Sequence, residues 1–218
     1  EIQFGQFCIG SEPGPDLAMA CRKFKEEVNF EKLMDVNQRI AEEIANDKIV
    51  ARCSGRMEFG ARALGNRSIL AAPNNFKNIQ RINRAIKKRD FWMPFAPAIL
   101  KDQADRYIYV PKALQDVGSP YMMFTFDAKP DFIGDLVCGT HQADQTVRAQ
   151  LVTKEFYPDL YEIISAVHEL NGIPAVLNTS FNLHGFPIVN STTEALEVFI
   201  KSDLDLLFVE DMVFSKKK

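Results

Sequence analysis

Two pairs of polar residues, each separated by one position, could bind a phosphorylated substrate. Lys87 and Arg89 supply two cations, whereas Ser180 and Asn182 supply a hydroxyl and an amide. Residues two apart in an extended segment point to the same face, so each pair would present both side chains together. If the two faces meet, they form a pocket for phosphate oxygens and a small polar acyl group. Taken singly, each pair is better explained by structure alone, as a helix end or a turn after a strand.

A further group of cations lies in residues 55–70, which read GRMEFGARALGNRSIL. This segment follows a strand-like run and contains three glycines together with Arg56, Arg62 and Arg67. A strand that leads into a glycine-broken, arginine-rich turn is a common anion-binding arrangement. A surface loop with solvated arginines explains the composition equally well.

His141, Asp144 and Arg148 form a third group, spaced three and four residues apart. A histidine and a carboxylate suit metal binding or acid–base work, but two potential ligands are too few for a metal site. The alternation around Arg148 places it on the polar face of a half-buried strand. No Gly-x-x-x-x-Gly-Lys-Ser/Thr phosphate loop occurs, so any nucleotide must be held in another way.

The elements that must position these residues alternate between helices and short apolar strands. The hydrophobic spacing predicts helices over residues 30–47, 76–86, 101–108, 160–170 and 192–199. It predicts strands over 49–53, 68–71, 121–126, 146–152, 173–177 and 204–209, with an extended sheet-edge segment over 89–100. Residues 1–29 are expected to be irregular. The pattern favours an α/β or α+β domain in which helices flank a twisted sheet.

Length and composition narrow the class of protein. The chain has 218 residues and a net charge of -3, which argues against a nucleic-acid-binding domain. It contains no apolar run near the roughly 20 residues that span a bilayer, and no signal peptide. Its four scattered cysteines fit free thiols in a reducing cytosol. We therefore expect a cytoplasmic protein without membrane or nucleic-acid partners.

The arginine-rich motif resembles the hallmark of the C-terminal domain of NodU/CmcH-type O-carbamoyltransferases, which are biosynthetic enzymes. The resemblance runs from about Phe30 onward and continues through Pro94-Phe95-Ala96-Pro97, Ser119-Pro120-Tyr121-Met122, His141/Asp144/Thr146/Arg148/Gln150 and Asn178-Thr179-Ser180-Phe181-Asn182 with Gly185. It implies a YrdC-like fold, a twisted mixed sheet flanked by helices.

The resemblance also implies an ATP-binding transferase. The domain would form carbamoyl-adenylate from carbamoyl phosphate and ATP, with Mg²⁺ arriving with the ATP. An N-terminal actin-like ATPase-type domain of the same full-length chain would then transfer the carbamoyl group to a hydroxyl acceptor. Residues 1–29 are interpreted as the tail of that missing domain and a linker, and residues 30–218 as the carbamoyltransferase C-terminal domain.

The resemblance assigns roles to ten residues of this sequence and no metal ligand. The catalytic residues are Lys87, Arg89, Arg148, Ser180 and Asn182. The substrate- or nucleotide-binding residues are Arg56, Arg62, Arg67, His141 and Asn178.

Three positions depart from the family pattern. Ala61, Met93 and Phe186 stand where proline, arginine and glutamate are usual. The missing arginine at position 93 removes a cation from the expected site. The alternative function is therefore a non-catalytic YrdC-like module that binds nucleotide or RNA without turnover.

Overall fold

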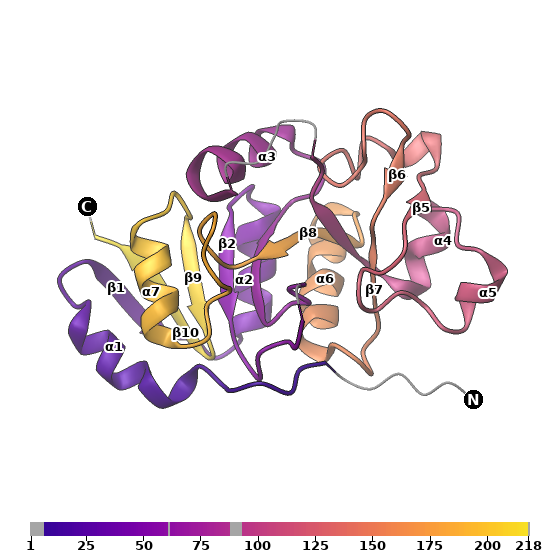
Figure 1. Cartoon of the computed structure of the whole chain (residues 1–218). Coiled ribbons are helices and arrows are strands. Elements are labelled where there is room, and N and C mark those ends of the chain that lie inside the picture. The colour runs from indigo at the N-terminus through magenta and orange to yellow at the C-terminus, as the bar shows by residue number, and fades with distance from the viewer. Residues whose placement is uncertain (1–6, 61, 88–92, 218) are drawn as a thin grey trace.

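An eight-stranded mixed sheet forms the centre of the protein. The computed structural model describes residues 7–60, 62–87 and 93–217, and Figure 1 shows the whole chain. The strand order is β1-β10-β9-β2-β3-β8-β4-β7. The β2–β9 and β4–β7 pairs are parallel, and the other neighbours in this sheet are antiparallel. The predicted class, a mixed sheet flanked by helices, is confirmed.

The strands are short and come from both halves of the chain. The main sheet contains β1 (Val28–Lys32), β2 (Val50–Cys53), β3 (Arg67–Ala71), β4 (Ala96–Leu100), β7 (Gln150–Val152), β8 (Ala175–Ser180), β9 (Leu206–Val209) and β10 (Met212–Lys216). A second, two-stranded sheet contains β5 (Phe126–Asp127) and β6 (Thr146–Val147).

Helices connect the strands and cover the main sheet. They are α1 (Leu17–Lys23), α2 (Val36–Ala45), α3 (Phe76–Ile82), α4 (Ala104–Tyr107), α5 (Lys112–Gln115), α6 (Pro158–Asn171) and α7 (Thr192–Ile200). A π-helical turn, η2 (Asn83–Lys87), extends α3, and 3-10 turns occur at η1 (Gly14–Asp16), η3 (Lys101–Gln103) and η4 (Pro130–Phe132). Among the described residues, no helix has both the length and the apolar character needed to cross a bilayer.

Both faces of the sheet are buried, which explains why its central strands read as continuous apolar runs. In β3, Ile69 packs on the side of α1, α3 and α7, whereas Leu70 packs on the side of α2 and α6. In β8, Leu177 and Val176 divide in the same way. Figure 1 shows α2 and α6 side by side along the sheet, and these two helices contact each other. A third apolar cluster surrounds α4, β5 and β6.

The N-terminal segment and the edge of the sheet that it forms differ from the sequence prediction. Residues 1–29 were expected to be irregular, but α1 lies within them and β1 begins at Val28. Burial of Ala20 and Phe24 anchors α1, whose seven residues are too few to show a helical period. β1 is an edge strand of the sheet and pairs with β10. The sequence predicted neither of these two strands.

Three further predictions about strands are corrected. Residues 121–125 do not form a strand, because Tyr121 and Met122 turn into the core and Met122 has a φ of 56°. Residues 146–152 divide into β6 and β7, with Arg148 between them. The segment near Pro97 is not at a sheet edge, since β4 lies between β8 and β7; β7 pairs with it only from Ala98 onward.

The remaining predictions match closely. Helices α2, α3, α6 and α7 and strands β2, β3 and β9 lie where the spacing placed them, although the helix predicted from residue 30 begins at Val36. Gly172, with a φ of 80°, ends α6 as predicted. Strand β8 starts at Ala175 and continues through Ser180. Asn178, Thr179 and Ser180, which were expected to follow a strand, are therefore its last three residues.

Candidate functional site

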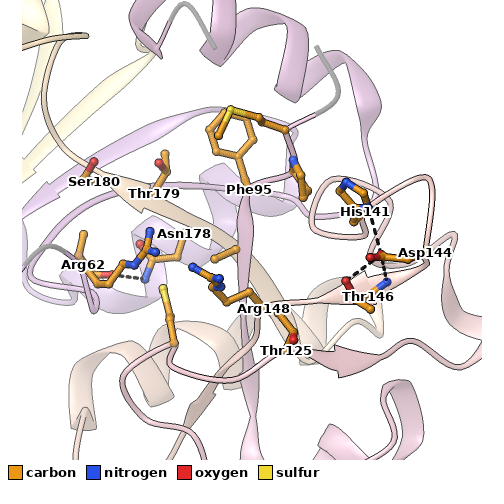
Figure 2. A pocket seen from close by; sticks show the side chains of 15 residues that line it. Arg62, Phe95, Thr125, His141, Asp144, Thr146, Arg148, Asn178, Thr179 and Ser180 are labelled. Atoms are coloured by element: carbon orange, nitrogen blue, oxygen red, sulfur yellow. Dashed lines mark hydrogen bonds and ion pairs between the residues drawn. The ribbon is translucent and has the colours of Figure 1, made fainter. Parts of the chain in front are cut away.

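A cavity of about 390 Å³ opens beside the C-terminal end of β8 (Figure 2). The β2–β3 loop, the end of β8, the segment leading into β4 and the residues around β6 contribute its walls. Its lining residues are Arg62, Ala63, Met93, Pro94, Phe95, Ala96, Met122, Thr125, His141, Asp144, Thr146, Arg148, Asn178, Thr179 and Ser180.

Two arginines provide the positive charge of this cavity. Arg62 comes from the β2–β3 loop and Arg148 from the link between β6 and β7, and both are exposed. Figure 2 shows both side chains at the end of the cavity where Asn178 lies. Neither guanidinium makes an ion pair or a hydrogen bond with any described residue. Two unpaired guanidinium groups beside one cavity favour an anionic ligand.

Asn178 is a buried polar residue in the wall of the same cavity. The residue is 1% exposed, and its Nδ2 donates to Ala63 O at 3.2 Å and to Gln150 Oε1 at 2.9 Å. Its Oδ1 is itself buried and has no hydrogen-bond partner among the described residues. The two hydrogen bonds tie β8 to the loop that carries Arg62 and to the start of β7.

Lys87, Ser180 and Asn182 come together at the edge of the cavity, where Ser180 lines the wall. Lys87 is 3% exposed, and its Nζ lies 2.9 Å from Ser180 Oγ and 2.6 Å from Asn182 Oδ1. It also donates to the backbone oxygens of the same two residues, at 2.6 and 3.2 Å. The same-face argument from extended chain applies to neither pair, because Lys87 lies in a π-helical turn and Asn182 lies in a tight turn after β8. Ser180 and Asn182 still meet, since Ser180 Oγ donates to Asn182 Oδ1 at 2.6 Å. Arg89 lies outside the described residues.

His141, Asp144 and Thr146 form a hydrogen-bonded turn on the opposite wall (Figure 2). Asp144 Oδ1 accepts from the Thr146 backbone N–H at 3.0 Å and from its hydroxyl at 2.8 Å, and lies 2.9 Å from His141 Nδ1. These contacts, the Thr146 backbone N–H first, lower the pKa of Asp144 below its usual value. The carboxylate is therefore charged at neutral pH. No cluster of three metal-ligating side chains exists within the described residues.

Glu58 shapes the loop that carries Arg62. Its Oε1 accepts hydrogen bonds from the backbone N–H groups of Leu64, Asn66 and Arg67, at 2.7, 2.8 and 3.2 Å. The side chain is buried, and these three donors converge on one carboxylate oxygen. Such a set of converging N–H groups fixes the course of the loop around the anion. The Glu58 carboxylate therefore interacts with the backbone of its own loop, and Glu58 does not line the cavity.

The arginine-rich motif divides its cations between two tasks. Arg67 is fully buried, and its guanidinium donates to backbone oxygens of the loop and of distant segments, including Ser11 O at 3.0 Å and Asn190 O at 3.3 Å. Arg56 donates to Gly10 O at 3.0 Å and also to Ile9 O. Neither residue lines the cavity, so the expectation that all three arginines share one anion site is corrected: Arg62 alone reaches it.

Sequence reasoning did not single out several residues that build the site. Thr125 and Thr179 line the cavity, and Gln150 holds Asn178 from behind. Gln150 could have been noticed as a lone polar residue at the start of the apolar run Gln-Leu-Val. Of the three departures, Met93 lines the cavity and Phe186 lies on the surface, 66% exposed. Ala61 is outside the described residues.

Comparison with known proteins places the chain in a family. A family model described as Carbamoyltransferase C-terminus matches residues 41–216. The chain belongs to this family. The match includes both cavity arginines, Asn178 and the Lys87 cluster, so the carbamoyltransferase C-terminal domain contains the whole candidate site.

A curated relative extends this similarity along the chain. Nodulation protein NolNO of Sinorhizobium fredii is 37% identical over 211 residues, which cover 94% of this chain and 30% of that protein. Uncharacterized protein MJ1051 of Methanocaldococcus jannaschii is 40% identical over 88% of this chain, and nodulation protein NolO of Bradyrhizobium diazoefficiens is 34% identical over 96% of it. The chain spans only 30% to 37% of the length of these three relatives.

Two solved structures share the fold. Full-length HypF in its phosphate- and nucleotide-bound form matches with a TM-score of 0.54 and 15% identity, over 87% of this chain and 22% of HypF. E. coli YciO matches with a TM-score of 0.55 and 14% identity, over 80% of this chain and 77% of YciO. These likenesses confirm the predicted YrdC-like fold.

Proposed function

We propose that this carbamoyltransferase domain binds carbamoyl phosphate and ATP in the cavity and forms carbamoyl-adenylate there. One observation carries the proposal: two guanidinium groups, neither with a partner among the described residues, line a single cavity. Membership of the Carbamoyltransferase C-terminus family supports the carbamoyl group as the transferred unit. Transfer to a hydroxyl acceptor would take place in another domain of a full-length chain, with an actin-like ATPase-type fold.

Phosphate binding falls to Arg62 and Arg148. Their planar forks suit pairs of phosphate oxygens and would neutralise charge on the two substrates. The HypF structure with bound phosphate and nucleotide supports such ligands for a domain of this fold. Mg²⁺ would arrive with ATP, and Asp144 is the one carboxylate among the described residues that line the cavity.

The chemistry needs charge stabilisation more than proton transfer. Water attacks the phosphorus of carbamoyl phosphate, the bond from phosphorus to the carbamoyl oxygen breaks, and the proton from water passes to the phosphate or to solvent. Inorganic phosphate leaves, and carbamate stays bound. A carbamate oxygen then attacks the α-phosphorus of ATP, and the bond to the leaving pyrophosphate breaks. Preorganised cations such as Arg62 and Arg148 stabilise the charge that develops in these steps, and the carbamate is already a nucleophile.

Lys87, Ser180 and Asn182 would form the edge of the site. The Lys87 side chain connects the other two residues. Its ammonium lies beside Ser180, which faces the cavity, and fixes the backbone of the turn after β8. We assign Lys87 a positioning and electrostatic role, with Ser180 and Asn182 as polar contacts to the adenylate. Arg89, two residues further on, is proposed as a second cation from the family resemblance alone. His141, whose Nδ1 faces Asp144, would contact substrate from the opposite wall.

Carbamoyl-phosphate-dependent exchange between ATP and pyrophosphate tests this function. We expect exchange by the unmodified chain and a loss of about 100-fold or more in Arg62→Ala and in Arg148→Ala, because each removes one preorganised cation. Arg22→Ala is the matched control, since Arg22 is exposed on α1, away from the cavity, and should leave exchange unchanged. Equal exchange in all four proteins would place the reaction elsewhere.

Met93 favours a second candidate, a domain that binds nucleotide without turnover. This methionine occupies a cavity position where the family resemblance expects an arginine, so the site has one cation fewer. Calorimetry separates the two functions. ATP binding that depends on Arg62 and Arg148, without exchange even when an N-terminal domain is supplied, would support the binding module.

A further inference from the structure

We infer that residues 7–11, here called the strap, position Arg62 and thereby set the affinity of the cavity for its anionic ligand. The inference rests on the proposed function and adds a positioning segment that lies outside the cavity. Among the described residues that line the cavity, none belongs to the strap. The strap would therefore act through the loop that it contacts.

The strap runs antiparallel to the first limb of the β2–β3 loop, residues 56–59. Cys8 and Glu58 form an antiparallel β-bridge at its centre. Three backbone hydrogen bonds join the two segments: Gly10 N–H to Met57 O at 2.9 Å, Met57 N–H to Ser11 O at 2.9 Å and Phe59 N–H to Phe7 O at 2.6 Å. The Arg56 guanidinium adds two more, because it donates to the successive carbonyls of Ile9 and Gly10. The strap therefore fixes the course of the first limb.

Arg62 lies between this limb and the second limb of the loop, residues 64–67. Glu58 joins the two limbs, since its carboxylate accepts from the Leu64 N–H at 2.7 Å. Arg67 ties the second limb to the strap as well, because its guanidinium donates to Ser11 O at 3.0 Å. The Arg62 side chain has no partner among the described residues that could hold it in place. Its reach into the cavity therefore depends on the backbone on either side, which the strap supports.

The strap has its own anchors on the body of the protein, so it can support the loop. At one end, the Phe7 ring stacks on Tyr121, with 4.2 Å between ring centroids. At the other end, Ser11 Oγ donates to Asn190 Oδ1 at 2.6 Å. Between them, Cys8 packs against the apolar cluster on the α2 and α6 side of the sheet. A bound ligand that holds Arg62 in place and a docked strap should consequently favour each other.

Gly10 offers a substitution that displaces the strap. A Cβ at this position would lie 2.9 Å from Met57 Cβ and 3.0 Å from Met57 O, so the backbone must move to admit it. Gly10→Val should raise the Kd for ATP, measured by calorimetry, about tenfold, the effect of one charge-assisted hydrogen bond. Gly134→Val is the matched control and should leave the Kd unchanged. Gly134 is exposed, does not line the cavity, and a Cβ there would meet nothing within 4 Å.

A double-mutant cycle separates positioning of Arg62 from a general loss of structure. If the strap acts through Arg62, Gly10→Val should change the Kd for ATP by less than about twofold in the Arg62→Ala protein. It should keep its full effect in the Arg148→Ala protein, where Arg62 is still present. Arg56→Met removes the bonds to the strap without a clash and should show the same pattern.

The cycle distinguishes the inference from the proposed function. ATP binding by the unmodified chain with an unchanged Kd in Gly10→Val would overturn the inference and leave the proposed function standing. A full tenfold loss in the Arg62→Ala background would overturn it too, because the strap would then act on the fold rather than on Arg62. If the unmodified chain does not bind ATP, the proposed function fails, and the inference fails with it.

Discussion

Four arginines in and near the candidate site differ in burial, and their roles differ accordingly. Arg52 and Arg67 are buried in hydrogen bonds to protein oxygens, and Arg52 also pairs with Asp159 at 2.5 Å. Arg62 and Arg148 are exposed, and neither has a partner in the part of the chain that the structure describes. The first two hold the loop in place, and this leaves the second two free to bind a ligand.

At Lys87, structure and proposed binding can be separated by one substitution. Lys87→Met leaves the oxygens of Ser180 and Asn182 without their ammonium donor, and we expect a loss of about 2 kcal/mol in the free energy of unfolding. The turn after β8 should loosen, and the Kd for ATP should rise by about 10- to 100-fold. Urea unfolding and calorimetry measure the two effects.

Lys77→Met is the control, because Lys77 is exposed on α3 and makes no side-chain contact to the site. It should change neither quantity by more than experimental error. A Lys87→Met protein with normal ATP affinity would remove Lys87 from the proposed site and leave it a structural residue.

The sequence predicted part of this residue-level arrangement. The spacing of Ser180 and Asn182 and of Lys87 and Arg89 raised one pocket as a possibility, on the condition that the two faces meet. Spacing alone could not bring together Lys87 and Ser180, which are 93 positions apart. The different fates of Arg62 and Arg67 were not predictable, because both occur in the same glycine-broken motif. Arg67 is buried by backbone oxygens of Ser11 and Asn190, residues far from it in sequence.

Among the helices, α7 has two caps at its N-terminus. Its own capping box joins Ser191 and Glu194, as the sequence predicted. A second cap comes from Asp16 in η1, whose carboxylate accepts from the backbone N–H groups of Thr192 and Thr193, each at 2.9 Å. This pair of bonds fastens the N-terminal segment to the far end of the chain.

The pH dependence of stability should report this second cap. Partial burial raises the pKa of Asp16, but the hydrogen bonds from Thr193 and Thr192 outweigh it and bring the pKa below its usual value of 3.8. A lowered carboxyl pKa stabilises the fold above the unfolded pKa, and that contribution disappears as pH falls through the folded pKa. Asp16→Asn should therefore cost about 1 kcal/mol at neutral pH and progressively less below about pH 4.

Urea unfolding at several pH values, with Asp131→Asn as an exposed control on η4, measures this difference. A cost that stays constant from neutral pH to about pH 3 would show that the Asp16 charge does not stabilise α7.

The sequence identified the helices with an apolar stripe, α2, α3, α6 and α7, and the fully apolar strands β2, β3 and β9. It missed β1, which reads Val-Asn-Phe-Glu-Lys and is exposed after Val28. Its apolar–polar alternation covers only four residues, too few to distinguish a strand from the irregular segment that was expected there. It forms because β10 supplies a partner, and that pairing joins segments nearly the whole chain apart.

Over the whole molecule, hydrogen exchange should distinguish the sheet centre from the site. Amides of β3 and β8 lie in the middle of the sheet with both faces buried, so we expect them to exchange slowest. Adding ATP and phosphonoacetamide, a stable analogue of carbamoyl phosphate, should slow exchange in residues 58–66 and 141–148, which carry the cavity cations. Exchange in β1 should stay unchanged. Mass spectrometry of peptic peptides resolves these segments.

Arg148→Ala provides the comparison, since it should lose the ligand-dependent protection and keep the slow exchange of β3 and β8. Ligand protection centred on β1 and β10 would instead place the binding surface at the opposite end of the sheet.

The strand order has a consequence for how the chain is made. β4 lies between β7 and β8, and β2 lies beside β9, so strands synthesised early wait for neighbours synthesised late. On a ribosome that releases the chain from its N-terminus, β1 and β4 emerge with no sheet partner, and β2 has only β3 beside it. Non-local pairing of this kind folds slowly and leaves apolar strands open to aggregation. We therefore expect the nascent domain to be most exposed to aggregation until β8, β9 and β10 leave the exit tunnel, and slower synthesis of residues 175–216 to lengthen that exposure.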